Sequence, residues 1–134
     1  MNIIRQLNLK RLFEKHREEF LAAMAQVLDR TAYIGGEELD AFEKAFGAWV
    51  GEGAFAVGCA NGTDAITLAA KALRCPEGSE AIAPAMTYVA TVEGLLHAGF
   101  KVRLVDVQSD TWVMDPKGLE AVVTPKTRII APVH

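Results

Sequence analysis

The sequence predicts an α/β fold, in which a parallel-type sheet carries helices on both faces. From Gly53 onward, short apolar segments containing Val and Ile alternate with segments of helical periodicity. Parallel strands need a crossover connection, which is usually a helix that packs on the sheet. The chain has 134 residues, of which 51% are hydrophobic, as in one globular domain. We therefore expect a single domain over 1–134, helical over 1–52 and alternating over 53–134.

Two amphipathic helices are expected before the sheet. Apolar residues recur every three or four positions from Leu9 to Leu28, which predicts one long helix. His16 lies on its apolar stripe, where a packing role is more common than a functional one. A second helix is predicted over Leu39–Val50, and the acidic residues in its first turn suit the positive end of the helix dipole.

The alternating region contains the predicted strands Phe55–Cys59, Glu80–Ala83, Lys101–Val105 and Arg128–Val133. The helices predicted between them are Thr63–Leu73, Tyr88–His97 and a short helix from Pro116 to about Val123. Asp115 is expected to cap the short helix, because a capping side chain followed by proline is a typical helix start.

Asn61, Gly62 and Thr63 follow the first predicted strand and open a helix. The first backbone N–H groups of a helix have no intrahelical partner, and the helix dipole adds partial positive charge. Gly62 leaves the approach open, and the hydroxyl of Thr63 can donate as well. This arrangement predicts a small pocket for an anion, most naturally a phosphate. An ordinary N-cap, in which Asn61 or Thr63 satisfies its own helix, is the alternative.

Further polar and aromatic residues follow the other strands. In sheets of this class, ligands bind at the carboxyl ends of the strands, where Ala85–Tyr88, Asp106 and His134 are expected to lie. The ring of Tyr88 offers a face for stacking on a planar heterocycle, or it packs against its own loop. The chemically interesting residues therefore converge on one edge of the sheet.

Composition and motifs exclude several classes of function. A net charge of −3 gives no basic field for nucleic acid or anionic membrane. Gly51–Ala56 has the glycine spacing of a dinucleotide fingerprint but precedes a strand, and Gly58–Thr63 lacks the lysine of a P-loop. The histidines lie too far apart to suggest a metal site. Cys59 and Cys75 are expected as buried, reduced thiols and no secretory signal is evident, so we expect a cytoplasmic protein.

Several motifs occur in a characteristic order. Asn61–Ala65 reads Asn-Gly-Thr-Asp-Ala, Pro84–Thr91 reads Pro-Ala-Met-Thr-Tyr-Val-Ala-Thr, and Pro132–His134 reads Pro-Val-His. Together they resemble the DegT/StrS family of pyridoxal-phosphate-dependent sugar aminotransferases, from about Leu28 to the last residue. The resemblance implies the N-terminal part of the large domain of the aspartate-aminotransferase-like fold.

The resemblance also implies which residues serve the cofactor, pyridoxal 5'-phosphate. The backbone amides of Gly62, Thr63 and Asp64 would hold its phosphate, and Tyr88 would stack on its ring. The family needs a lysine for the Schiff base and a carboxylate beside the ring nitrogen. In relatives both lie beyond the Pro-Val-His stretch, so we assign no catalytic residue in this chain and expect it to be inactive alone.

For the substrate, Tyr33, Ile34 and Gly35 match a segment near the sugar site, and His134 would shape the pocket. The implied reaction moves an amino group from glutamate to a keto-sugar nucleotide, for amino-sugar or polysaccharide biosynthesis, in a homodimer. Two alternatives stay open. One is a sugar dehydratase of the same family, with histidine in place of the Schiff-base lysine. The other is a non-catalytic, truncated remnant that persists by oligomerising.

Overall fold

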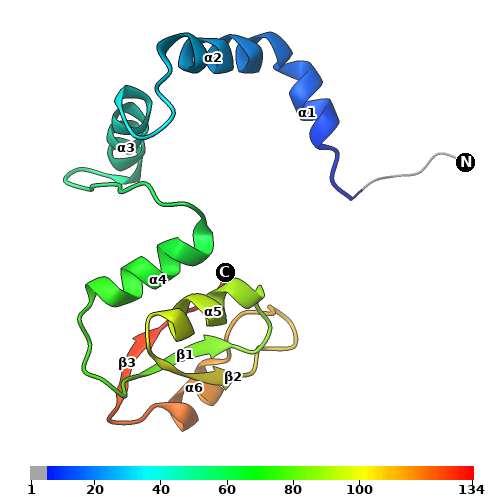
Figure 1. Cartoon of the computed structure of the whole chain (residues 1–134). Coiled ribbons are helices and arrows are strands. Elements are labelled where there is room, and N and C mark those ends of the chain that lie inside the picture. The colour runs from blue at the N-terminus through cyan, green and yellow to red at the C-terminus, as the bar shows by residue number, and fades with distance from the viewer. Residues whose placement is uncertain (1–5) are drawn as a thin grey trace, which may run out of the picture. The chain divides into compact units, whose positions relative to one another are not determined.

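The computed structural model describes residues 6–134, and the chain divides into two compact units, Met1–Gly58 and Cys59–His134 (Figure 1). The first unit is helical, and the second alternates helices with strands. This division lies close to the predicted change from helical to alternating structure after residue 52. The single domain predicted for 1–134 stays a prediction.

The helices of the first unit are α1 (Leu9–Lys15), α2 (Arg17–Arg30) and α3 (Glu37–Val50). The prediction of one continuous helix over Leu9–Leu28 is wrong, because the chain turns at His16, where ψ is +24°. The backbone N–H of His16 donates to the carbonyls of Leu12 and Phe13, which ends α1. The His16 ring lies 3.2 Å from Oε1 of Glu19 and packs edge-on against Phe20, as expected for a packing histidine.

The segment after α3 is extended but belongs to no sheet. The predicted strand Phe55–Cys59 is therefore wrong, because no other strand of the described chain pairs with it. It runs back along α3 instead, where Oε1 of Glu43 accepts the backbone N–H of Gly58 at 2.6 Å. A Cβ on Gly47 would lie 2.9 Å from the carbonyl oxygen of Ala54, so this close approach requires glycine.

The second unit contains α4 (Gly62–Ala72), β1 (Glu80–Pro84), α5 (Val89–His97), β2 (Lys101–Val105), α6 (Pro116–Val122) and β3 (Thr127–Ile130). The strands form a sheet in the order β2-β1-β3, and both pairings are parallel. The predicted α/β class and the parallel sheet are confirmed. Asp115 caps α6 as predicted, because its carboxylate accepts the backbone N–H groups of Lys117 and Gly118 at 3.1 and 3.3 Å.

Two apolar clusters cover the two faces of this sheet. Ala81 and Ala83 of β1 face Leu95 of α5 and Ala70 of α4. Ile82, which points the other way because side chains alternate along a strand, packs with Val105 and Met114 beneath α6. Helices therefore lie on both faces, as the sequence predicts.

The two cysteines differ from the prediction. Both thiols are free, but Cys59 is exposed and Cys75 is half-buried. Cys59 lies in the connection before α4, outside both apolar clusters. The sequence predicts a buried Cys59 because it places this residue in a strand, and that strand does not form.

A carboxylate joins three segments at the amino end of the sheet. Oε2 of Glu80 accepts the Thr124 hydroxyl at 2.7 Å and lies 3.5 Å from Nη1 of Arg103. The hydrogen bond from Thr124 and the charge of Arg103 hold the pKa of Glu80 below its ordinary value of 4.5. Glu80 thus links β1 to β2 and to the turn before β3.

We expect Glu80→Gln to destabilise the second unit at neutral pH and to flatten its acid sensitivity. The folded-state pKa of Glu80 is lowered, so its stabilisation is present above the ordinary pKa and is lost as pH falls through the lowered value. Urea unfolding at pH 7 should separate the variant from the wild type, and the two should converge once the pH lies below the lowered pKa of Glu80. Glu77→Gln, at an exposed position nearby, is the control. An equal effect of both substitutions would contradict the role of Glu80.

Candidate functional site

The start of α4 is shaped by the side chain of Asn61. Its Oδ1 accepts the backbone N–H of Asp64 at 2.9 Å, and its carbonyl oxygen accepts the N–H of Ala65 at 3.0 Å. Asn61 is thus a true N-cap, as in the alternative that the sequence left open. Among the described residues, however, the amides of Gly62 and Thr63 have no hydrogen-bond partner. Two donors therefore remain at the positive end of an 11-residue helix.

These donors suit a phosphate group. Apart from the adjoining residues and the backbone of α4, no heavy atom lies within 4 Å of a Cβ placed on Gly62, so no other part of the chain blocks this side of the turn. The hydroxyl of Thr63 adds a third donor on the same turn. Because the N–H of Asp64 already donates to Asn61, the predicted bond from the Asp64 amide to a phosphate would require that cap to open. The structure therefore offers Gly62 and Thr63 as the available donors.

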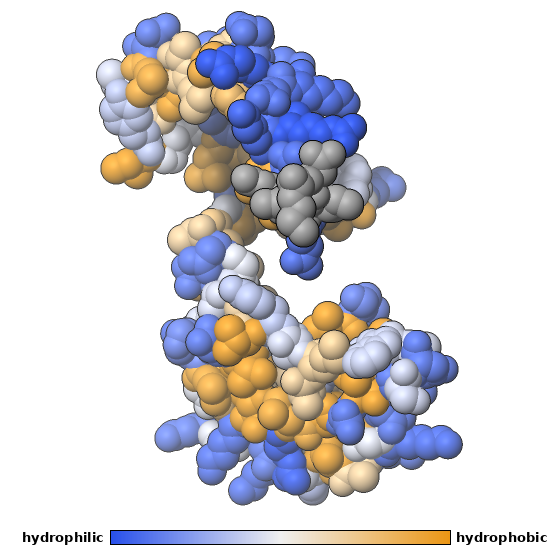
Figure 2. All heavy atoms as spheres, turned by 90° about the vertical axis from the view of Figure 1, so that its right-hand side faces the viewer, coloured by the Kyte–Doolittle hydropathy of each residue, from blue (hydrophilic) through white to orange (hydrophobic). Residues whose placement is uncertain are grey.

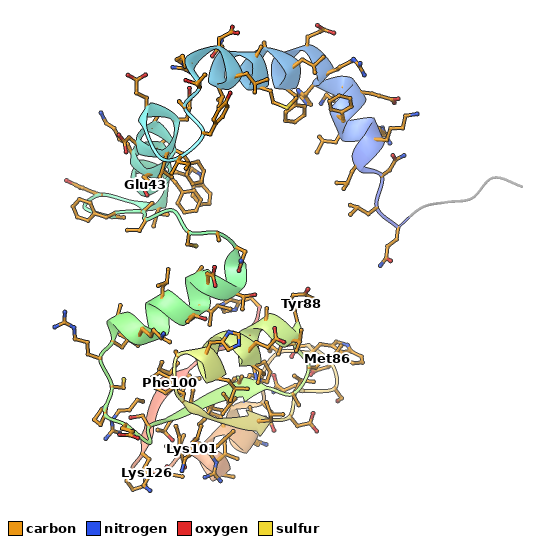
Figure 3. The ribbon with its side chains drawn as sticks, in the orientation of Figure 1. Glu43, Met86, Tyr88, Phe100, Lys101 and Lys126 are labelled. Carbon is orange, nitrogen blue, oxygen red and sulfur yellow. The ribbon has the colours of Figure 1, made fainter. Side chains whose placement is uncertain are left out.

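Tyr88 lies at the start of α5 with its side chain outward. It is the N-cap residue of this helix and is 80% exposed. The hydroxyls of Thr87 and Thr91 lie 2.8 Å apart, and the N–H of Thr91 donates to the carbonyl of Tyr88 at 3.0 Å. Figure 3 shows Tyr88 and Met86 beyond the carboxyl end of β1, at the opposite end of the sheet from Lys126. The ring is thus available for stacking and is not packed into a core.

Tyr33, Ile34 and Gly35 lie in the first unit, in the turn between α2 and α3. Tyr33 is 64% exposed and Ile34 97% exposed, while Gly35 has a φ of +62°. Arg30, the last residue of α2, forms ion pairs with Glu37 and Glu38 at the start of α3, which joins the two ends of this turn. The turn therefore presents its side chains outward, while its ends are held by charge.

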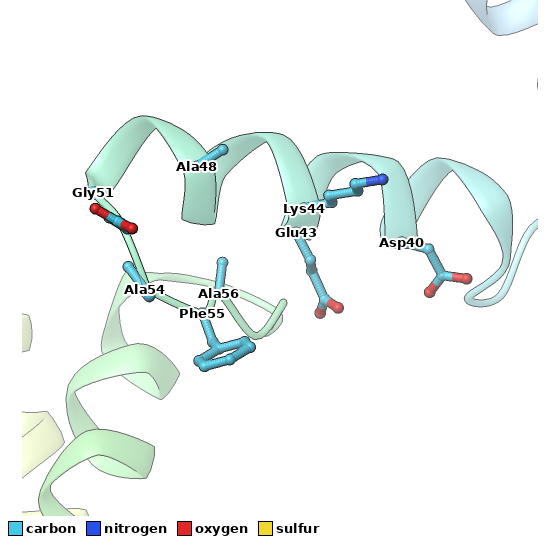
Figure 4. Close-up of a pocket in the computed structure, with 10 residues that line it drawn as sticks. Asp40, Glu43, Lys44, Ala48, Gly51, Ala54, Phe55 and Ala56 are labelled. Atoms are coloured by element: carbon cyan, nitrogen blue, oxygen red, sulfur yellow. The ribbon is translucent and has the colours of Figure 1, made fainter.

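A separate hollow of about 700 Å³ lies in the first unit between α3 and the segment that follows it (Figure 4). Its lining includes Asp40, Glu43, Lys44, Phe55 and Ala56. None of the residues predicted to bind cofactor or substrate lines this hollow. His134, the remaining predicted pocket residue, is exposed at the end of the second unit.

Residues 6–134 offer neither a metal site nor a membrane-spanning helix. No group of three His, Cys, Asp or Glu side chains is arranged to hold a metal ion in this range. In the same range, every helix is too short or too polar to span a membrane.

Comparison with known proteins identifies similar chains. One is a UDP-N-acetyl-3-dehydro-alpha-D-glucosamine 3-aminotransferase of Acidithiobacillus ferrooxidans, which is 38% identical over 131 residues. The match covers 98% of this chain and 35% of that relative, so the chain spans about a third of the relative's length.

Solved structures agree with this match. The crystal structure of DesV from Streptomyces venezuelae has a TM-score of 0.93 and 37% identity, and the match covers 100% of this chain and 36% of DesV. A GDP-4-keto-6-deoxymannose-3-dehydratase with a trapped PLP-glutamate geminal diamine has a TM-score of 0.75 and 30% identity. That match covers 84% of this chain and 30% of the dehydratase. The fold predicted from the resemblance is therefore confirmed.

The sequence profile of the DegT/DnrJ/EryC1/StrS aminotransferase family matches residues 14–134. This range includes every residue predicted to contact cofactor or substrate. The chain therefore belongs to the DegT/DnrJ/EryC1/StrS aminotransferase family.

Proposed function

We propose that this chain is the N-terminal part of a pyridoxal-phosphate-dependent aminotransferase that acts on keto-sugar nucleotides. The observation that carries the proposal is the pair of free amides at Gly62 and Thr63, in the same unit as the exposed ring of Tyr88. Similarity to sugar aminotransferases over nearly the whole chain supports the same function.

In this proposal each residue has a distinct role. The amides of Gly62 and Thr63 hold the phosphate, and hydrogen bonds to a charged group are the stronger class. Tyr88 covers one face of the ring, which fixes its orientation and excludes water from that face. Pyridoxal phosphate, when bound, supplies the electron sink for chemistry at the carbon–nitrogen bond. Tyr33, Ile34 and Gly35 contact the sugar, and glutamate is the amino donor.

The likeness to a dehydratase supports a second candidate reaction. The residue at the Schiff-base position decides between the two, since lysine there favours amino transfer and histidine favours dehydration. Reading the gene in frame beyond the codon for His134 gives this residue directly. A downstream frame without a Ser-x-x-x-x-Lys motif would remove the aminotransferase proposal.

The proposed protein is a homodimer. Its support is the amount of apolar surface that the chain exposes, since large exposed patches usually mark interfaces. Figure 2 shows hydrophobic side chains gathered on one face of the second unit. In the first unit, the exposed apolar residues of α1 and α2 are Leu9, Leu12, Phe20, Leu21, Met24 and Leu28. Light scattering after size-exclusion chromatography tests this, and a stable monomer at micromolar concentration would contradict it.

A cytoplasmic location is supported by the two free thiols.

Ligand titration of the 134-residue chain tests the cofactor site. Pyridoxamine 5'-phosphate is the suitable probe because it lacks the aldehyde that reacts with surface lysines, and inorganic phosphate reports the amides alone. Helix-end amides support only about millimolar affinity for phosphate after binding costs. We expect both ligands to shift the amide NMR signals of residues 61–65. Shifts confined to other residues of the folded chain would contradict the assignment.

Tyr88→Leu should weaken pyridoxamine phosphate binding about tenfold, because stacking on an aromatic ring contributes about 1–3 kcal/mol. Tyr88→Phe keeps the ring and should bind as the wild type does. Phosphate affinity should be the same in all three proteins, because Tyr88 contacts only the heterocycle. A Tyr88→Leu variant that binds pyridoxamine phosphate normally would remove Tyr88 from the site.

A further inference from the structure

The contact between α4 and α5 is unusually close at Gly94. A Cβ on Gly94 would lie 2.8 Å from both Cβ and Cγ2 of Ile66 and 3.0 Å from the carbonyl oxygen of Thr63. Real side chains do not approach so closely, so any residue larger than glycine must move α4 away from α5. The backbone of α5 is therefore seated directly against the first turns of α4.

A hydrogen bond reinforces this contact. The hydroxyl of Thr67 lies 3.0 Å from the carbonyl oxygen of Thr63 and 3.1 Å from that of Gly94. Its single hydrogen is shared between an acceptor on its own helix and one on α5. Thr67 is half-buried, so water competes weakly for these acceptors. The hydrogen bond from Thr67 to Gly94 therefore connects α4 to α5, in addition to the close contact at Gly94.

The two halves of the proposed cofactor site lie at the starts of these helices. The free amides of Gly62 and Thr63 begin α4, and Tyr88 precedes the first residue of α5. The carbonyl oxygen of Thr63 lies beside Gly94. Tyr88, the N-cap residue of α5, precedes Gly94 by six residues. At the rise of an α-helix, the start of α5 therefore projects about 9 Å beyond the point of contact. The separation of the amides from Tyr88 is set by how α4 and α5 pack.

We propose that Thr67 and Gly94 are positioning residues, which set the spacing between the phosphate-binding amides and the ring of Tyr88. This inference rests on the proposed function. A ligand that carries both a phosphate and a ring gains from the second contact only if the two sites lie at the matching distance. A displacement of α4 against α5 would leave each half intact and remove the gain from binding both together.

The test compares two ligands in four proteins. Dissociation constants for inorganic phosphate and for pyridoxamine 5'-phosphate are measured in the wild-type chain and in Thr67→Val, Thr67→Ser and Gly94→Ala. Phosphate reports the amides alone, whereas pyridoxamine phosphate requires both halves. We define the preference as the dissociation constant for phosphate divided by that for pyridoxamine phosphate. A general loss of stability does not change this ratio as long as the sample is folded. Circular dichroism verifies the fold of each variant.

We expect Thr67→Val and Gly94→Ala to lower the preference about fivefold, with the phosphate dissociation constant unchanged within about twofold. Thr67→Ser keeps the hydroxyl and should retain the wild-type preference. A wild-type preference in both Thr67→Val and Gly94→Ala would overturn the inference, and so would equal weakening of both ligands. If Gly94→Ala does not fold, Thr67→Val and Thr67→Ser decide. A wild-type chain with no preference would instead contradict the ring contact in the proposed function, and this inference with it.

Discussion

Replacing Leu95 by alanine is expected to destabilise the second unit by about 3 kcal/mol. Leu95 is 1% exposed and packs in the cluster between the sheet and α4 and α5, with Ala81, Ala83 and Phe100. Two of these neighbours are alanines on a strand and cannot move in to fill the space that the leucine leaves. The loss therefore combines the transfer of buried methyl groups to water with the cost of a cavity.

The neighbouring residue provides a matched control. Leu96 is the same residue type on the same helix but is 52% exposed, so Leu96→Ala should cost well under half as much. Urea unfolding followed by circular dichroism measures both. Since whole domains are stable by only about 5–15 kcal/mol, Leu95→Ala should shift the midpoint strongly. Similar midpoints for the two variants would mean that Leu95 does not lie in the core.

Gly62→Val is expected to abolish phosphate binding at the start of α4. Apart from the adjoining residues and the backbone of α4 itself, no heavy atom lies within 4 Å of a Cβ at this position, so the variant should fold. Its methyl groups would occupy the open approach to the amides of Gly62 and Thr63. Each hydrogen bond to a charged group contributes about 1.5–3 kcal/mol, so blocking both should weaken binding by more than about tenfold. Thr63→Val, which removes only a hydroxyl, should weaken binding modestly.

Ala65→Val is the control for this experiment. It places the same β-branched side chain at an exposed position of α4, beyond the free amides. Valine has a lower helix propensity than alanine and a higher one than glycine, so a loss of binding in Gly62→Val alone cannot come from a weakened helix. Phosphate titration by NMR compares the two. Wild-type affinity in Gly62→Val would show that phosphate does not bind at these amides.

Features that depend on neighbours in the chain were predictable. Asp115 followed by proline marks the start of α6, and Asn61 caps α4, because a capping side chain bonds to amides two or three residues away. The alternation of helices with short apolar strands likewise predicted the parallel sheet of β1, β2 and β3. The same local signals at the start of α4 are the basis of the phosphate site that we propose there.

Local patterns also misled in two places. The apolar periodicity across His16 is continuous, yet the chain turns there, because the backbone of one residue can end a helix without altering the pattern on either side. Phe55–Cys59 has the composition of a strand, but a strand exists only when another backbone supplies its hydrogen bonds. Among residues 6–134 none does, so this segment lies along α3.

The sequence by itself determined the fold class, the capping residues of α4 and α6, and the residue types of the proposed cofactor site. Only the tertiary structure decided how these parts are spaced. Thr67 and Gly94 are 27 residues apart, and Glu80 and Thr124 are 44 apart, so no local pattern relates the members of either pair. Gly94 gives no signal in sequence, because its importance comes from the missing Cβ that lets Ile66 approach. The reason is physical: capping and periodicity are properties of adjacent residues, whereas close packing depends on which surfaces the whole chain brings together.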